Sequence, residues 1–206
     1  MKVYLINGSP KQTGTTFFAL SHVKNALIQN GIEAEIYWVG NKPISGCLGC
    51  GACRTKGKCV IEDKVNEFAD LAKSADGFIF GSPVHYAAAS GFITAFMDRL
   101  FYSAGKNLAY KPASSVTVAR RGGQSSTFDQ LNKYFTINQM PVVSSTYWNQ
   151  VYGLNGEQAH EDLEGLQCME ILGNNMSWLL KCIECGKNND INTPPMPTRI
   201  GTNFIR

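Results

Sequence analysis

The strongest constraint on this chain is its opening segment, where a short apolar run at residues 3–6 breaks into a polar loop and then into a helical stretch from Thr15. This order predicts a strand, a loop and a helix start. The first turn of a helix has backbone N–H groups without partners inside the helix, and the helix dipole makes that end partly positive. The segment therefore predicts an anion site that suits a phosphate monoester.

The loop between the predicted first strand and first helix is rich in hydroxyl side chains and contains one lysine. It contains neither G-x-G-x-x-G nor G-x-x-x-x-G-K-S/T, which argues against a dinucleotide fingerprint and a Walker loop. The remaining nucleotide interpretation is a loop that binds the phosphate of a mononucleotide such as FMN. The alternative is an ordinary capped helix after a first strand, because helix caps favour Ser and Thr. The candidate phosphate ligands are Ser9, Lys11, Thr13, Thr15 and Thr16.

Strand and helix patterns alternate along the chain, which predicts an α/β fold with a doubly wound parallel sheet. We expect five strands in the flavodoxin-like order 2-1-3-4-5, with the ligand at the carboxyl ends of strands one and three. The predicted strands are residues 2–6, 32–39, 77–81, 114–119 and one within 141–147. The predicted helices are residues 15–29, 65–73, 91–101, 125–138 and a long one over 157–186, interrupted at Gly165 or Gly173.

Two further loops at the same edge of the sheet carry candidate ligand-binding residues. The loop after strand three holds Pro83, Val84, His85 and Tyr86, whose rings can stack or hydrogen-bond. The loop after strand four holds Arg120, Gly122 and Gly123, whose charge and backbone N–H groups would stabilise a reduced flavin. The alternative is that His85 is an ordinary loop histidine and the glycines a plain turn. His85 is the one candidate for a catalytic side chain.

Composition limits the classes of partner. The 206 residues fit one domain, which we place at residues 1–190 with a cysteine-rich loop at 44–64, followed by a tail at 191–206. The net charge is only +3 and no Lys/Arg cluster follows a helix, so we expect no nucleic-acid partner. Apolar runs fall short of the roughly 20 residues that span a bilayer, and no basic-then-apolar leader precedes the first strand. We therefore expect a soluble cytoplasmic protein without a membrane partner.

Four of the seven cysteines form the pattern C-x2-C-x2-C-x5-C at Cys47, Cys50, Cys53 and Cys59. A reducing compartment disfavours a disulfide framework. The first three cysteines are spaced like the start of a bacterial ferredoxin run, although Val60 stands where such runs have proline. Three interpretations remain: an iron–sulfur cluster, a reduced loop that supports the flavin pocket or a partner, and a zinc site or redox disulfide. The other cysteines, Cys168, Cys182 and Cys185, are interpreted as small buried apolar residues.

Several segments together resemble the NAD(P)H-dependent FMN reductases of the flavodoxin-like fold, and within them the iron–sulfur flavoprotein branch. The resemblance runs from residue 1 to about 150 and is carried by residues 8–11, 47–53, 59–63, 75–77, 82–84 and 96–99. It implies FMN with its phosphate in the loop 9–16 and its ring against residues 83–86, with Gly122 and Gly123 near the pyrimidine side. It also implies a [4Fe–4S] cluster on the four cysteines. The family often has Tyr directly after the Pro-Val pair, where this chain has His85.

The resemblance leads to two functional hypotheses. In the first, NAD(P)H reduces bound FMN, and a small acceptor such as a flavin or a quinone then takes the electrons at the same open face. In the second, the protein is an electron carrier that exchanges single electrons with ferredoxin through the cluster. A flavodoxin-sized chain leaves one flavin face open, and the tail carries apolar residues at positions 194–197, 200, 204 and 205. We therefore expect a homodimer or homotetramer, with a disordered tail as the alternative.

Overall fold

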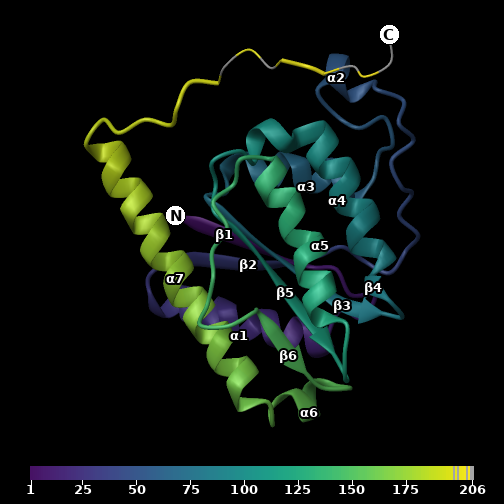
Figure 1. Cartoon of the computed structure of the whole chain (residues 1–206), viewed down its shortest axis with the longest axis vertical. Helices are drawn as coiled ribbons and strands as arrows, with labels where there is room; N and C mark the ends of the chain where they lie inside the picture. Colours follow the sequence, from purple (N-terminus) through teal and green to yellow (C-terminus); the bar gives the residue numbers. More distant parts are fainter. Residues whose placement is uncertain (197, 199, 203, 205–206) are drawn as a thin grey trace.

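The apolar runs form a central parallel sheet in the order β2-β1-β3-β5-β6, as Figure 1 shows for the computed structural model, which describes residues 1–196, 198, 200–202 and 204. This is the doubly wound order expected from the sequence. The two-residue strand β4 pairs antiparallel with the end of β3. The strand bounds are β1 (Lys2–Asn7), β2 (Glu33–Trp38), β3 (Gly77–His85), β4 (Ala88–Ala89), β5 (Ala113–Ala119) and β6 (Gln150–Tyr152).

Helices cover both faces of the sheet. On one face, α3, α4 and α5 bury an aromatic cluster that includes Phe68, Phe96 and Phe135. On the other face, α1 and α7 bury a mainly aliphatic cluster and lie against each other. The helices are α1 (Thr15–Gln29), α2 (Cys53–Lys56), α3 (Lys64–Leu71), α4 (Gly91–Ala104), α5 (Gln124–Ile137), α6 (Gly156–Ala159) and α7 (Leu163–Asn188), with 3-10 turns at Ala72–Ser74 and Gly105–Asn107.

The last strand lies later in the chain than the sequence pattern predicted. Residues 141–147 contribute only an isolated bridge, between Val142 and Ala113, and β6 pairs with β5 instead. The connection is held by Asn149, whose Nδ2 donates to Ser114 Oγ at 2.9 Å and to the Ser115 carbonyl at 3.0 Å. Because the buried Asn149 takes the place of strand pairing, this segment has no alternation of apolar and polar residues from which a strand could be predicted.

The C-terminal helical region is interrupted before the glycines that the sequence suggested. The break falls at residues 160–162, where the Asp162 carboxylate accepts the Gly165 N–H at 3.0 Å and caps α7. Gly165 and Gly173 are helical. A Cβ on Gly173 would lie 2.6 Å from Ala26 Cβ, so this glycine allows α7 to approach α1 closely.

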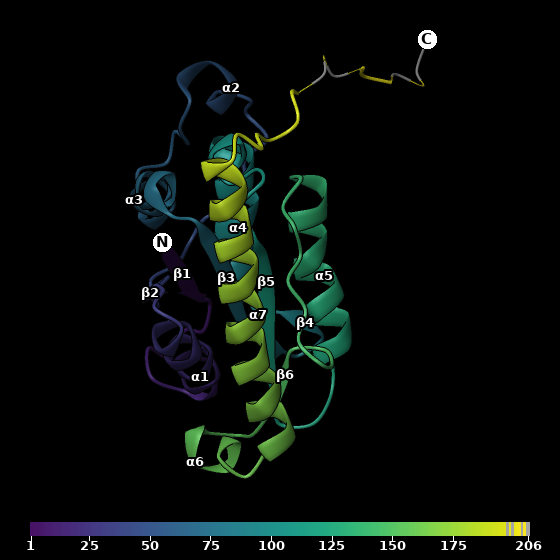
Figure 2. The same cartoon turned by 90° about the vertical axis from the view of Figure 1, so that its left-hand side faces the viewer.

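The C-terminal tail leaves α7 as an extended segment, which Figure 2 shows running away from the body of the molecule. The Tyr110 hydroxyl lies 3.4 Å from Met196 Sδ. Pro197 and Ile205, which belong to the predicted apolar tail, lie outside the described residues. The assignment of residues 191–206 as an oligomer contact stays a prediction.

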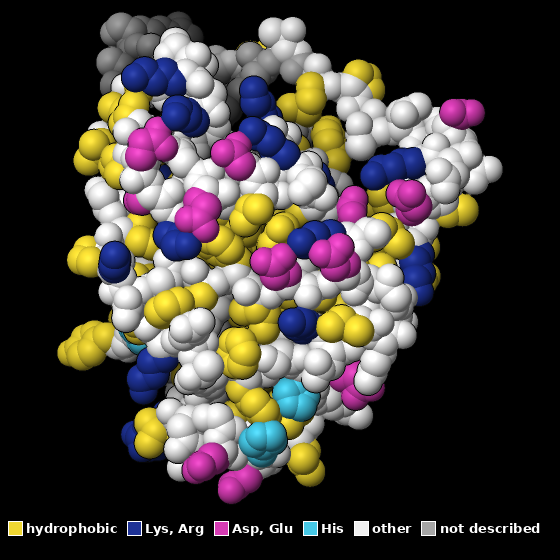
Figure 3. Space-filling view, turned by 180° about the vertical axis from the view of Figure 1, so that it is seen from behind, with side chains coloured by type: hydrophobic (Ala, Val, Ile, Leu, Met, Phe, Trp, Pro, Cys, Tyr) yellow, Lys and Arg dark blue, Asp and Glu magenta, His cyan; other side chains and the backbone are white. Residues whose placement is uncertain are grey.

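Two surface features bear on possible partners. On the face seen in Figure 3, Lys and Arg side chains are interspersed with Asp and Glu side chains and form no single basic patch. In the part of the chain that the structure describes, none of the helices has both the length and the apolar character needed to cross a bilayer.

Candidate functional site

The loop between β1 and α1 is fixed by side chains that the sequence interpretation did not include. Asn7 is fully buried, and its Oδ1 accepts the Ser9 N–H at 3.0 Å while its Nδ2 donates to the Gln12 carbonyl at 3.0 Å. Trp38 Nε1 donates to the Ser9 carbonyl at 2.9 Å. Ser9 Oγ in turn accepts the Lys11 N–H at 3.2 Å. These hydrogen bonds of the chain itself therefore define the shape of the loop.

The N-terminus of α1 is open. Its N-cap residue, Gly14, has no side chain to cap the helix, and the helical ladder starts with the bond from Phe18 N–H to the Gly14 carbonyl at 2.9 Å. The N–H groups of the first turn therefore stay available for an anion. Thr16 is buried in this turn, and a Cβ on Gly81 would lie 3.0 Å from Thr16 Cγ2. This glycine lets β3 and α1 approach each other beside the loop.

A cleft of about 370 Å³ lies in front of this loop, at the carboxyl edge of the sheet. Its walls come from the loops that follow β1, β3, β5 and β6, which converge at the same edge. The predicted site residues that it brings together are Ser9, Lys11, Thr13, Thr15, Thr16, Pro83, Val84, His85 and Arg120. Segments far apart in the chain thus meet where the sheet order reverses direction, as expected for this topology.

Three predicted residues lie outside the lining of the cleft. Tyr86 is fully exposed, with a positive φ of 61°. Gly122 and Gly123 border a neighbouring pocket instead. Gly123 nevertheless contacts the cleft wall, because a Cβ there would lie 2.8 Å from Val84 Cγ1 and its φ is +92°. Only glycine fits this contact without strain.

The fourth wall of the cleft was missed by the sequence analysis. It consists of residues 153–156, directly after β6. The signal was present, because a Gly-Leu-Asn-Gly segment is typical of a turn. With the last strand expected at 141–147, this turn had no assigned place at the edge of the sheet. Ser90 was missed as well: its Oγ donates to the Gly8 carbonyl at 2.6 Å and ties the start of α4 to the loop between β1 and α1.

The four cysteines of the loop at residues 44–64, called here the cysteine loop, line one pocket of about 300 Å³. Cys47 and Cys50 are exposed, Cys53 and Cys59 are half-buried, and all four are free thiols. Arg99 and Tyr102 of α4 form the opposite wall. Within the described residues, no three His, Cys, Asp or Glu side chains lie close enough to hold a single metal ion.

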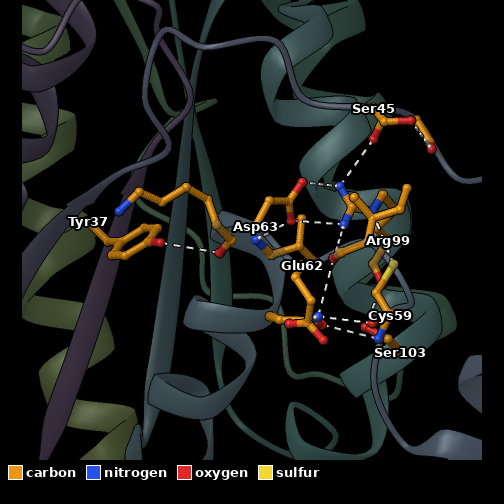
Figure 4. Close-up of polar contacts among 12 residues, drawn as sticks. Tyr37, Ser45, Cys59, Glu62, Asp63, Arg99 and Ser103 are labelled. Atoms are coloured by element: carbon orange, nitrogen blue, oxygen red, sulfur yellow. Dashed lines mark hydrogen bonds and ion pairs between the residues drawn. The ribbon is translucent and has the colours of Figure 1, made fainter.

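Arg99 holds the two ends of the cysteine loop together (Figure 4). Its side chain is 1% exposed and forms a two-point ion pair with Asp63, at 2.6 Å and 2.8 Å. The same guanidinium donates to the Ser45 carbonyl at 3.4 Å, before the first cysteine, and to the Ile61 carbonyl at 2.9 Å, after the last one.

Arg99 also reaches a cysteine directly, because its Nε donates to Cys59 Sγ at 3.3 Å. Burial alone would lower the pKa of Arg99. The hydrogen bonds to Asp63 and Cys59 outweigh that effect and raise the pKa above its ordinary value. The guanidinium therefore places a permanent positive charge at the wall of the thiol pocket.

A second side chain fixes only the Cys59 half of the loop. Asn66 of α3 is buried, its Nδ2 donates to the carbonyls of Cys59 at 2.9 Å and Ile61 at 3.2 Å, and its Oδ1 accepts the Cys59 N–H at 3.1 Å. The half with Cys47 and Cys50 has no equivalent support among the described residues. The Cys59 half of the loop is thus held by more side-chain hydrogen bonds than the half with Cys47 and Cys50, which Arg99 bonds only at the Ser45 carbonyl.

The family model and the most similar curated proteins agree on the family to which this chain belongs. The family described as NADPH-dependent FMN reductase matches residues 1–153. An iron-sulfur flavoprotein of Methanocaldococcus jannaschii is 34% identical over 193 residues, which cover 89% of this chain and 100% of the relative. An iron-sulfur flavoprotein of Methanosarcina thermophila is 29% identical over 194 residues, which cover 92% of this chain and 100% of the relative.

Solved structures agree on the fold. The crystal structure of RosB with its bound intermediate, 8-demethyl-8-formylriboflavin-5'-phosphate, superposes with a TM-score of 0.70 at 13% identity. The match covers 100% of this chain and 94% of that chain. At this identity the likeness establishes the doubly wound architecture.

Proposed function

Because this chain belongs to the NADPH-dependent FMN reductase family, we propose that it binds FMN in the cleft at the carboxyl edge of the sheet, with the phosphate in the loop 9–16. The observation that carries this proposal is the uncapped N-terminus of α1, which opens into the same cleft as Pro83, Val84 and His85. Free N–H groups, hydroxyls and the Lys11 cation suit a phosphate dianion.

The residues of the cleft divide into two roles in this proposal. Ser9, Lys11, Thr13, Thr15 and Thr16 hold the phosphate. Pro83, Val84 and His85 form the wall for the flavin ring, and Arg120 places a positive charge at the rim. Bound FMN supplies the hydride and electron-transfer chemistry, while the protein supplies position and charge. We propose NAD(P)H as the electron donor and a small molecule as the acceptor.

We further propose that the cysteine loop holds a [4Fe–4S] cluster through Cys47, Cys50, Cys53 and Cys59. Each thiolate in such a cluster binds a different iron, so the thiols must surround a volume rather than meet at one point. Four thiols around a 300 Å³ pocket fit that requirement better than they fit a single zinc ion. The Arg99 guanidinium would offset part of the thiolate charge.

The thiol pocket supports a second candidate function, that of an electron carrier which exchanges single electrons with ferredoxin. The specific observation is that Ile44, the first residue of the cysteine loop, and the preceding Pro43 line a small surface pocket together with His85 of the proposed flavin wall.

Anaerobic mixing separates the two functions. The protein loaded with FMN, iron and sulfide is mixed in turn with NADPH, NADH and reduced ferredoxin while the yellow flavin absorbance is followed. A reductase loses that absorbance rapidly with a nicotinamide nucleotide. A carrier loses it with reduced ferredoxin only. Protein that retains no FMN after reconstitution contradicts both proposals.

We also infer that the chain forms a homodimer or homotetramer through its tail. The described part of the tail is extended and exposed, and it includes the apolar side chains of Ile191, Met196 and Ile200. Light scattering of the FMN-loaded protein after gel filtration measures the assembly mass. A monomer would contradict the inference.

A further inference from the structure

The four sulfurs that line the thiol pocket differ in their surroundings. Cys59 Sγ accepts a hydrogen bond from Arg99 Nε at 3.3 Å, and among the described residues it is the one sulfur of the four that is bonded to a charged side chain. Cys53 Sγ lies 3.5 Å from the Tyr102 carbonyl oxygen, which can accept a hydrogen bond but cannot donate one. The other two cysteines of the loop are exposed. The buried positive charge therefore acts on the Cys59 side of the pocket.

Both partners of the bond between Arg99 and Cys59 are held in place. The Arg99 side chain is 1% exposed, and its two terminal nitrogens are tied to Asp63 at 2.6 Å and 2.8 Å, which leaves Nε directed at the sulfur (Figure 4). Asn66 fixes the backbone of Cys59, because it accepts the Cys59 N–H and donates to the Cys59 carbonyl. The distance from the guanidinium to the sulfur is thus set by the fold.

A charge in this position is poorly screened by water. The guanidinium is buried, and the pocket lining next to it includes the apolar residues Val60 and Ile61. The attraction between two charges grows as the local dielectric constant falls. Arg54 also lines the pocket, but it is exposed, so solvent and salt screen its charge. Arg99 should therefore act on a negative charge at Cys59 Sγ more strongly than Arg54 does.

From these observations we propose that Arg99 acts through Cys59, as a positioning residue, to raise the reduction potential of a [4Fe–4S] cluster in the cysteine loop. The inference rests on the proposed function, because it concerns the cluster proposed above. Reduction adds one electron, and hence one negative charge, to a group whose thiolate ligands are already negative. A cation and a hydrogen bond at a ligand sulfur stabilise the reduced state more than the oxidised state. Arg99 supplies both.

Asp63 has the opposite effect on the same site. Its carboxylate is paired with Arg99 and offsets part of the guanidinium charge. Because Asp63 is 27% exposed, its influence should be the smaller of the two. The two partners therefore shift the potential in opposite directions if they act through charge. If the pair only supported the loop, loss of either partner would disturb the cluster in the same direction.

Potentiometric titration with dithionite tests the proposal. The protein loaded with FMN, iron and sulfide is reduced stepwise, and the EPR signal of the reduced cluster gives its midpoint potential. We expect Arg99→Gln to lower the ratio of reduced to oxidised cluster about tenfold at a given potential, equivalent to a fall of about 59 mV. Arg54→Gln is the matched control, because it removes an exposed arginine from the same pocket and should shift the potential less.

Asp63→Asn is a second variant with a predicted shift of the other sign. Asparagine keeps a side-chain oxygen that can accept the Val65 N–H and cap α3, as Asp63 does at 3.0 Å. Loss of the carboxylate leaves the Arg99 charge less compensated. We therefore expect the ratio of reduced to oxidised cluster to rise about threefold at a given potential.

Several results would overturn the proposal. Shifts of the same sign in Arg99→Gln and Asp63→Asn, or equal shifts in Arg99→Gln and Arg54→Gln, would contradict it. If Arg99→Gln alone fails to hold the cluster, the rise in Asp63→Asn decides. Loss of the cluster from both variants would show that the pair only supports the loop.

The same titration separates failure of this inference from failure of the proposed function. Unmodified protein that takes up no iron and sulfide would contradict both. A cluster whose midpoint potential is the same in all variants would contradict the role of Arg99 alone.

Discussion

The cleft in front of the loop 9–16, called here the flavin cleft after its proposed ligand, and the cysteine loop are two candidate cofactor sites that the chain builds in opposite ways. The cleft is positioned by the sheet: Trp38, Asn7, Gly81 and Val116 pair in one row across four strands, so the loops that follow them reach the same edge. The cysteine loop has one helix, the four-residue α2, in its described structure, and it depends on long-range bonds from Arg99 and Asn66. The comparison teaches that the first site is prepared by the fold, whereas the second needs individual side chains.

The largest effect is expected when all four cysteines of the cysteine loop are replaced, because iron binding should be lost and FMN binding kept. Replacing Cys47, Cys50, Cys53 and Cys59 together by Ser should abolish iron and sulfide binding while FMN binding is kept, because the cleft does not depend on the thiols. Anaerobic reconstitution followed by iron, sulfide and flavin analysis measures both, and about four irons per chain are expected in the unmodified protein. The control is the pair Cys182→Ser and Cys185→Ser on α7, because both cysteines are exposed, contrary to the prediction that they are buried. Loss of FMN together with iron would break the comparison.

The next largest effect concerns the support of the cysteine loop. Arg99→Leu leaves the Asp63 carboxylate without its counter-charge and should lower the free energy of unfolding by about 2–4 kcal/mol. This is less than for a fully buried pair, because Asp63 is 27% exposed. Urea unfolding measures the change, and limited proteolysis should show faster cleavage within the cysteine loop.

A matched double variant sharpens this prediction. In Arg99→Leu combined with Asp63→Leu, no charge is left unpaired, so part of the lost stability should return. An Arg99→Leu protein with unchanged stability and unchanged cleavage would show that the loop is held by other contacts.

A moderate effect is expected where a glycine shapes the cleft wall. Gly123→Ala places a methyl group against Val84 at a residue with positive φ, and it should weaken FMN binding about tenfold, equivalent to about 1.4 kcal/mol. Gly122→Ala is the control, because a Cβ there meets no atom within 4 Å. Flavin fluorescence titration measures both affinities. Equal affinities in the two variants would place this loop outside the FMN site.

The smallest effect is expected at the surface of the cysteine loop. Lys58→Gln breaks an ion pair with Glu62 of 2.7 Å whose two side chains are both largely exposed. Solvent screening leaves such pairs with little influence on stability. Iron content and urea midpoint should therefore stay unchanged, in contrast to Arg99→Leu. A loss of iron in Lys58→Gln would mean that the loop depends on its surface charges.

The alternation of strands and helices was enough to predict the sheet order, and the bounds of α1 agree with the predicted residues 15–29. That residues 8–14 form a loop between a strand and a helix was predictable because one contiguous segment carries it. β6 was misplaced because a three-residue edge strand has too few residues to show a pattern.

Arg99 lies within a segment that marked the family resemblance, but its role could not be read from sequence. Its bonding partners Ser45, Ile61 and Asp63 are 36–54 residues away in the chain, and only the packing of α4 against the cysteine loop brings them together. Asn7 and Trp38 escaped notice for the same reason, because the first is a strand end and the second belongs to the neighbouring strand.

The most direct test of this account compares FMN with riboflavin, which lacks the phosphate, in the unmodified protein and in Ser9→Ala combined with Thr16→Val. If the loop 9–16 holds the phosphate, FMN affinity should fall about tenfold or more in the double variant, as expected for lost charge-assisted hydrogen bonds, while riboflavin affinity stays the same. An equal fall for both ligands, or no fall for FMN, would contradict the account.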